Sequence, residues 1–147
     1  NLTSSIISSF ARSLFYVGQN SASESIGNTA TDENPGSAYA PLATISRAIN
    51  IIAATGDSST DYRIFVSGTV EENVEIPSDV DSKAKSILIK GANGLDSNRK
   101  PKDVLKASDS EIAVLVTKTT VPVTIENLKI SGSSFRGITA GSSSSVS

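Results

Sequence analysis

From Asp61 onward, the chain is built from short aliphatic runs that alternate with turn residues. Each run holds about three to five residues and ends in Gly, Asn, Asp, Ser or Pro, as in 64–66, 87–89 and 123–125. No helical spacing of apolar residues recurs after Gly56. A doubly wound α/β sheet needs a helix between consecutive parallel strands, so the sequence excludes that fold. The choice is between strands stacked in successive windings and a β-sandwich.

The runs repeat at a step that favours stacked windings. Ile64–Gly68 resembles Ile87–Gly91 at a step of 23 residues, and Val123 recurs as Val146 at the same step. A period of about 20–25 residues that contains two or three short strands is typical of a solenoid. A β-sandwich needs longer strands joined by Asn-Gly hairpins, and the Asn93-Gly94 pair opens a long polar excursion instead. The sandwich stays the alternative.

One amphipathic helix is predicted over Leu42–Ala54. Pro41 lies near its start, Thr44 is a suitable cap, and Gly56 stands where a helix ends. Its apolar face would cover the rung of Ile64 and Val66 and so close the N-terminal end of the stack. The C-terminal end has no such helix, so we expect the native chain to continue, or its open end to self-associate with another copy.

Two further segments complete the expected organisation. Residues 1–13 carry Leu2, Ile6, Ile7 and Phe10 at helical spacing, which predicts a short N-terminal helix. Residues 14–147 form one unit, the cap and first coils of the stack, truncated at the C-terminus. Within that unit, residues 19–39 are polar and predict a long loop, whose role the sequence does not give.

Composition removes several classes of function. The 147 residues carry 13 basic and 15 acidic side chains, dispersed along the chain, which argues against a nucleic-acid partner. No apolar run approaches the ~20 residues of a membrane span. The chain has no cysteine and no histidine, so it lacks thiolate ligands, the commonest general base and the usual partner of a serine nucleophile.

Several segments together resemble the opening of the pectate-lyase-like right-handed parallel β-helix proteins. They are Phe15–Val17, Ala40–Ile49, Ile64–Val70, Glu72–Val74 and Val123–Gly132. The last resembles the family's coil pattern V-T-I-x-N-L-x-I-x-G, and Val70 replaces a usual Tyr. The resemblance implies an all-β, right-handed single-stranded parallel β-helix with an N-terminal amphipathic capping helix. It is strongest to bacterial exported and surface members of the family.

The resemblance also implies two candidate functions. The leading interpretation is a non-catalytic, adhesin-like structural and interaction module, secreted or on the bacterial cell surface, with an unknown surface or matrix partner that includes carbohydrate among the candidates. The alternative is the N-terminal fragment of a polysaccharide lyase or glycosidase whose catalytic coils lie beyond Ser147. Enzymatic activity is left open, because fold alone does not give function. The non-catalytic role is favoured because the coils expected in this chain are too few for a long saccharide groove.

Two groups of acidic residues are candidates for a cation site. Carboxylates are the ligands that Ca²⁺ prefers, but alternating acids on a strand are more often plain solvated surface. The same holds for the cluster Asp32-Glu33-Asn34. We therefore assign no metal, and Ca²⁺ is the one cofactor considered. The main group of acids consists of Glu71, Glu72, Glu75, Asp79 and Asp81.

The other candidates also have plain structural interpretations. A lyase of the resembling family needs a basic side chain that faces its substrate. The loop holds three such side chains, Arg99, Lys100 and Lys102, but a solvated turn between coils explains them more simply. Tyrosine rings suit sugar stacking, but packing near the cap is favoured. No catalytic, cofactor-binding or metal-ligating residue is assigned. The remaining residues considered were Tyr16, Tyr39, Tyr62, Asn127, Phe135, Arg136 and Ser142–Ser145.

Overall fold

The computed structural model describes residues 13–18, 30–37, 40–107, 115–132, 138–140 and 145–146. Within them the chain is mostly β, with one α-helix, α3 (Ile45–Thr55), and one 3-10 turn, η1 (Ser78–Val80). The strands are β1 (Leu14–Val17), β2 (Asp61–Val66), β3 (Thr69–Glu71), β4 (Val74–Ile76), β5 (Ser86–Gly91), β6 (Asp103–Lys106), β7 (Leu115–Thr117), β8 (Pro122–Glu126), β9 (Leu128–Ser131), β10 (Ile138–Ala140) and β11 (Ser145–Val146).

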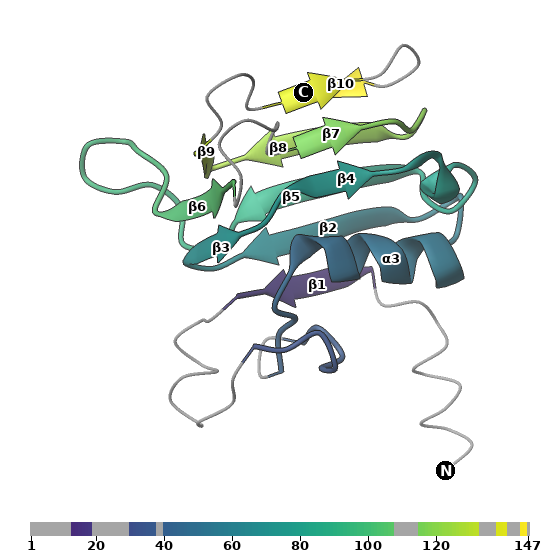
Figure 1. Ribbon diagram of the computed structural model, residues 1–147, viewed down its shortest axis with the longest axis horizontal. Coiled ribbons are helices and arrows are strands. Elements are labelled where there is room, and N and C mark those ends of the chain that lie inside the picture. Colours follow the sequence, from purple (N-terminus) through teal and green to yellow (C-terminus); the bar gives the residue numbers. More distant parts are fainter. Residues whose placement is uncertain are drawn as a thin grey trace.

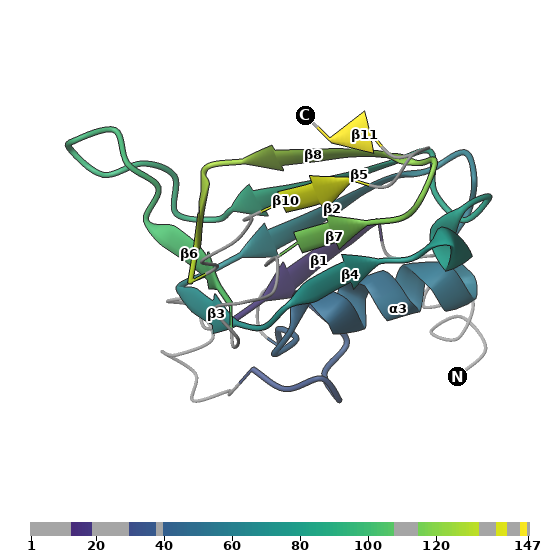
Figure 2. The same cartoon turned by 45° about the horizontal axis from the view of Figure 1, so that its top comes forward.

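The strands form three parallel sheets, which Figure 1 shows from the side. One sheet has five strands in the order β1-β2-β5-β8-β11, and two have three strands, in the orders β10-β7-β4 and β3-β6-β9. Every pair of neighbouring strands described in them is parallel. From β3 on, each strand belongs to a different sheet from the strand before it (Figure 2). The described strands therefore give no support to the sandwich alternative, which requires hairpins.

The prediction of a right-handed single-stranded parallel β-helix is wrong. The described residues form three small parallel sheets with one short helix, not a closed solenoid. A regular solenoid repeats at a fixed period. Here the step between paired residues is 25 from Tyr62 to Ile87, 36 from Ile87 to Val123 and 41 from Val74 to Leu115. Connections of unequal length separate the paired strands, and the expected regular winding is not kept.

The register also corrects one of the predicted repeats. Ile64 pairs with Ile89, two residues beyond the predicted partner Ile87. The step of 23 from Val123 to Val146 is confirmed. A slip of two residues leaves every side chain on the same face of a strand. The aliphatic run therefore predicted the strand β5 correctly and its register incorrectly.

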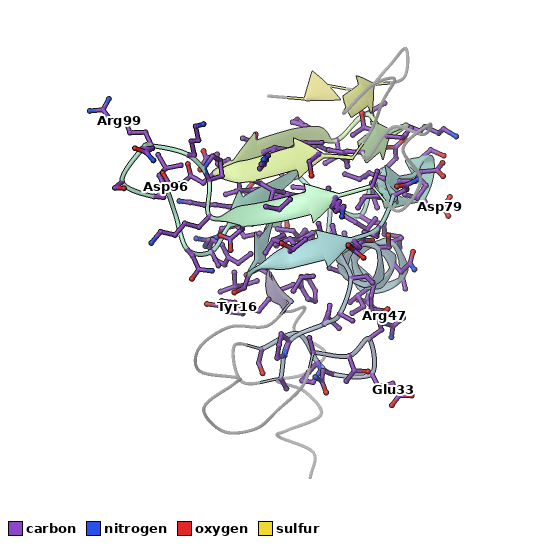
Figure 3. The ribbon with its side chains drawn as sticks, turned by 60° about the vertical axis from the view of Figure 1, so that its left-hand side comes forward. Tyr16, Glu33, Arg47, Asp79, Asp96 and Arg99 are labelled. Carbon is purple, nitrogen blue, oxygen red and sulfur yellow. The ribbon has the colours of Figure 1, made fainter. Side chains whose placement is uncertain are left out.

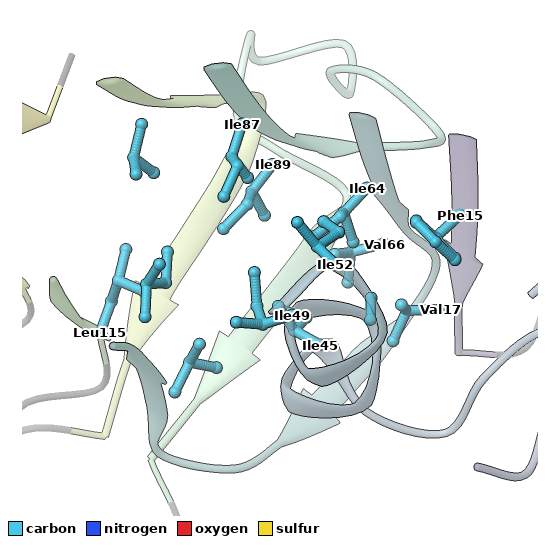
Figure 4. Packing of buried hydrophobic residues seen from close by; sticks show 14 of the residues in the cluster. Phe15, Val17, Ile45, Ile49, Ile52, Ile64, Val66, Ile87, Ile89 and Leu115 are labelled. Atoms are coloured by element: carbon cyan, nitrogen blue, oxygen red, sulfur yellow. The ribbon is translucent and has the colours of Figure 1, made fainter. Parts of the chain in front are cut away.

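The aliphatic core lies between the sheets and α3. In β2, Tyr62, Ile64 and Val66 are buried, whereas Asp61 and Arg63 are exposed. Burial of each such side chain stabilises the fold by about 1.5–3 kcal/mol. Figure 4 shows the labelled isoleucines of α3 on the side of the helix that faces β2. The helix contributes Ile45, Ala48, Ile49 and Ile52 to this core.

The helix begins three residues later than the sequence predicted and ends one residue later. Thr44 is its cap, and the Thr44 side chain accepts a hydrogen bond from the Arg47 N–H. The Asp32 carboxylate accepts from the N–H groups of Ala43 and Thr44 at 3.1 and 3.0 Å. Leu42 forms a bridge to β1. These contacts hold the residues before Thr44 outside the helix.

A second carboxylate joins the helix to the sheets. Glu72, between β3 and β4, accepts from the N–H groups of Ile45 at 2.6 Å and Ser46 at 3.2 Å. Negative charge is favourable at a helix N-terminus, where these N–H groups have no partner within the helix. The helix packs against β1, β2, β4 and η1. The outer edge of β1 is paired as well, because Tyr16 N–H donates to Gly36 and Leu42 N–H donates to Tyr16.

Candidate interaction loop

One segment leaves the sheets between β5 and β6 and returns to them. We call Ala92–Lys102 the interaction loop. Figures 1 and 2 show it extending beyond the ends of the strands, on the side away from η1. The step from β3 to β6, which contains this loop, is 35 residues, whereas the step from β6 to β9 is 25. The loop therefore accounts for the extra length of that connection.

The base of the loop is held by a buried carboxylate. Asp103 has no exposed surface. Its Oδ1 accepts from the Gly68 N–H and from Asn93 Nδ2, both at 2.8 Å, and its Oδ2 accepts from the Asn93 N–H at 2.8 Å. Asn93 Nδ2 also lies 3.2 Å from the Ser67 hydroxyl. Because hydrogen bonds to a charged acceptor are the stronger kind, this network fixes where the loop leaves β5 and enters β6.

Backbone hydrogen bonds order the two arms of the loop. Lys102 N–H donates to the Gly94 carbonyl at 3.1 Å, and Asp96 N–H donates to the Lys100 carbonyl at 2.8 Å. Between these bonds, Leu95 and Pro101 form an antiparallel bridge. As predicted, Asn93-Gly94 opens a polar excursion and not a hairpin between paired strands, because β5 and β6 lie in different sheets. Within the excursion, the two arms fold back on each other.

The tip of the loop is ordered by Asp96. Its Oδ1 accepts from the N–H groups of Asn98 at 2.8 Å and Lys100 at 3.0 Å, and the Asp96 carbonyl accepts from the Arg99 N–H at 3.0 Å. Asp is favoured in turns because its side chain can bond the backbone two residues on. Arg99 has a φ of +62°, which places it in the left-handed region. In Figure 3 the Arg99 side chain points away from the body of the molecule.

The surface of the loop combines cations with one leucine. Leu95 is 45% exposed and is the large hydrophobic side chain that lies exposed in the described part of the chain. Arg99, Lys100 and Lys102 are also exposed. Residues 92–102 lie together on a protruding, internally hydrogen-bonded segment. Protruding loops on a rigid scaffold are common sites of binding.

The acids considered for Ca²⁺ make separate contacts. Glu71 is paired with Lys106 of the neighbouring strand β6 at 3.5 Å, and Glu75 with Lys118, just after β7, at 3.0 Å. Glu72 bonds the start of α3, and Asp79 is exposed on η1. No group of three or more His, Cys, Asp or Glu side chains arranged for a metal occurs among the described residues. Nothing in this arrangement tests the Ca²⁺ expectation further.

The second acidic cluster and the tyrosines have structural contacts. Asp32 bonds the residues before α3, and Asn34 Nδ2 donates to the Pro41 carbonyl at 2.8 Å. Tyr62 is buried, and its hydroxyl accepts from the Asp57 N–H at 2.9 Å. The rings of Tyr16 and Phe65 contact each other, with centroids 5.6 Å apart. Tyr62 therefore has a packing role, which is the role that the sequence favoured.

Other predicted features lie outside the described residues. These are residues 1–12 of the helix expected over residues 1–13, most of the polar loop 19–39, and the side chains of Tyr39, Phe135, Arg136 and Ser142–Ser145. Self-association through the C-terminal end stays a prediction. No helix of the described part is long and apolar enough to cross a membrane.

Sequence reasoning missed the residues that build the loop. Asp103 is one of many dispersed acids, and its burial depends on Gly68, which lies 35 positions away. The available signal was the Asn93-Gly94 pair, which is the strongest short-range sign of a turned-back chain. Leu95 gave no signal, because a leucine in a loop cannot be told from a core leucine by type alone.

The structure predicts an acid-sensitive contact at Asp81. Hydrogen bonds from the Thr119 hydroxyl and the Thr120 N–H lower the pKa of Asp81. A lowered pKa gives stability that is present above the unfolded pKa, about 3.9, and is lost as pH falls through the folded value. Asp81→Asn is therefore expected to be less stable than the parent at pH 7. Urea unfolding should show the stabilities of the two proteins converging as the pH falls below the unfolded pKa.

Asp79→Asn, which changes the same charge on the same 3-10 turn, is the control for Asp81→Asn. None of the hydrogen bonds described here involves the Asp79 carboxylate, which is exposed. A difference in stability for Asp81→Asn that stays constant down to the lowest pH would contradict the assignment.

The comparisons with known proteins assign this chain to no family. The expected likeness to pectate-lyase-like proteins stays a prediction that rests on the residues quoted for it. No protein-family model, curated protein or solved structure matches the chain.

Proposed function

We propose that this chain is a non-catalytic structural and interaction module of a secreted or surface-exposed bacterial protein, and that it binds its partner through the interaction loop. One observation supports this proposal most. A loop that is internally hydrogen-bonded and anchored by Asp103 presents an exposed Leu95 and three cations to solvent. Because its conformation is already fixed, little entropy is lost when it binds.

The composition of the loop favours a role in binding a partner over a role in holding the fold together. Leu95 lies outside the core and beside the three cations of the loop, so an aliphatic side chain and positive charge are offered to a partner on one segment. Arginine is one of the side chains that typically contribute most of the binding energy at the centre of a contact. The partner is proposed to be a molecule of a cell surface or matrix, with carbohydrate among the candidates. Nucleic acid is not proposed.

The test is a binding and cleavage screen of the full chain. We expect at least one component of a panel of matrix proteins and polysaccharides to bind without being cleaved. For that component, Leu95→Ser combined with Arg99→Gln should weaken binding about fivefold or more. Arg47→Gln, on α3 at the far side of the molecule in Figure 3, is the control. Cleavage of any polysaccharide, or binding that ignores the loop, would overturn the proposal.

A further inference from the structure

The interaction loop differs in charge from the rest of the chain. Its three cations, Arg99, Lys100 and Lys102, and its one acid, Asp96, give it a net charge of +2. The whole chain carries −2, so the remainder carries −4. Charge of opposite sign on one protruding segment makes an approaching anionic partner meet that segment first, because it is repelled elsewhere.

The positive charge of the loop is not neutralised by the described acids. The ion pairs found in the described residues are Lys90–Glu126, Lys106–Glu71 and Lys118–Glu75. None of them includes a cation of the loop. Asp96, the acid within the loop, uses its Oδ1 to accept two backbone N–H groups at the tip. The three cations are therefore available to an external anion.

The apolar part of the loop requires a partner that has an apolar surface as well as negative charge. Leu95 is 45% exposed and lies across the antiparallel bridge from Pro101, which is half-buried. A partner that uses this surface must cover an aliphatic side chain and also carry carboxylates around it. A protein with an apolar pocket and an acidic rim provides both, and it can bind the Arg99 guanidinium with two parallel hydrogen bonds.

An anionic membrane fits these features less well. Each cation near an anionic leaflet raises affinity only about fivefold, and stable attachment takes a second strong signal. One half-covered leucine is a weak second signal. The remaining −4 charge of the chain would be repelled by the same leaflet. From these contacts we infer that the interaction loop docks into an acidic protein surface, with Leu95 in an apolar pocket and Arg99, Lys100 and Lys102 on its carboxylates.

This inference rests on the proposed function, and its test uses defined probes. Fluorescent short peptides of Asp and Glu, with and without a central hydrophobic patch of Leu and Phe, are titrated with the full chain. Vesicles of phosphatidylcholine with phosphatidylserine are titrated in parallel. We expect the acidic peptide with the hydrophobic patch to bind most tightly, with an affinity that falls as salt is raised.

Two variants assign the binding to the loop. Arg99→Gln/Lys100→Gln/Lys102→Gln is expected to weaken peptide binding about tenfold or more. Leu95→Ser is expected to remove the advantage of the patch-bearing peptide over the plain acidic one. Arg47→Gln/Lys83→Gln/Lys85→Gln removes the same charge from the α3 side and should change affinity less than about twofold. Circular dichroism melts confirm that each variant is folded.

The outcomes separate this inference from the proposed function. Equal losses for the two triple variants, or tighter binding to vesicles than to the acidic peptides, would overturn the inference. So would the absence of peptide binding by a chain that still binds a panel component through its loop, and in that case the proposed function stands. If no panel component depends on the loop while the acidic peptides bind to it, the inference stands and the wider proposal falls.

Discussion

Gly91→Ala is expected to lower the free energy of unfolding by about 3 kcal/mol or more. Gly91 ends β5, and a methyl group there would lie 1.9 Å from the Asn127 carbonyl oxygen and 2.9 Å from Asp103 Oδ2. The Asn127 carbonyl is backbone between β8 and β9, where Asn127 has a φ of +51°. It cannot move without shifting one of those strands. Urea unfolding followed by circular dichroism measures the loss.

Gly68→Ala is the matched control for this prediction. A methyl group on Gly68 meets no atom within 4 Å, so only its φ of +78° resists the change. The left-handed conformation costs a residue with a side chain about 1–2 kcal/mol. We therefore expect Gly68→Ala to be the milder variant. Equal stability of the two variants would show that Gly91 and the Asn127 carbonyl do not approach as closely as described.

Asp103→Ala is expected to lower the free energy of unfolding by about 3 kcal/mol. The substitution leaves the Gly68 N–H, the Asn93 N–H and the Asn93 side-chain amide without their acceptor. Buried donors without an acceptor cost more than the hydrogen bonds themselves contributed. Urea unfolding measures the loss, and amide hydrogen exchange should show faster exchange of the Gly68 and Asn93 N–H groups.

Two further variants separate the carboxylate from its position. Asp103→Asn keeps an oxygen for the Gly68 N–H but turns an NH₂ group toward the Asn93 N–H, so we expect a smaller but clear loss. Asp96→Ala removes an exposed turn carboxylate whose donors can bond water instead, and should cost about 1 kcal/mol or less. If Asp96→Ala proved as costly as Asp103→Ala, the buried network would not be the anchor of the loop.

The helix was the most predictable element of the fold. The spacing of Ile45, Ala48, Ile49 and Ile52 is local information, and the structure buries these four residues. Its first residue was less predictable, because Asp32 and Glu72 decide where the helix starts. Both carboxylates reach it from distant parts of the chain, and local propensity does not report such contacts.

The architecture was less predictable than the strands. Aliphatic runs correctly indicated short strands, but a pattern that repeats every two residues cannot separate Ile87 from Ile89 as the partner of Ile64. It also cannot show that the loop lengthens one connection between paired strands. The regular closed solenoid was wrong for this reason. In the candidate site, the three cations were noticed in the sequence, but Asp103 and Leu95 acquire their importance only from burial and exposure in three dimensions.

The return of the interaction loop onto itself makes it a natural place to insert foreign sequence. Its arms are joined by the Lys102–Gly94 and Asp96–Lys100 backbone hydrogen bonds, so the strands on either side do not depend on what the tip contains. Lengthening a flexible loop costs little, about 0.6 kcal/mol for each doubling. Peptides grafted between Asp96 and Lys100 would be displayed with both ends held together, which makes this small chain a scaffold for presenting epitopes or selecting binders.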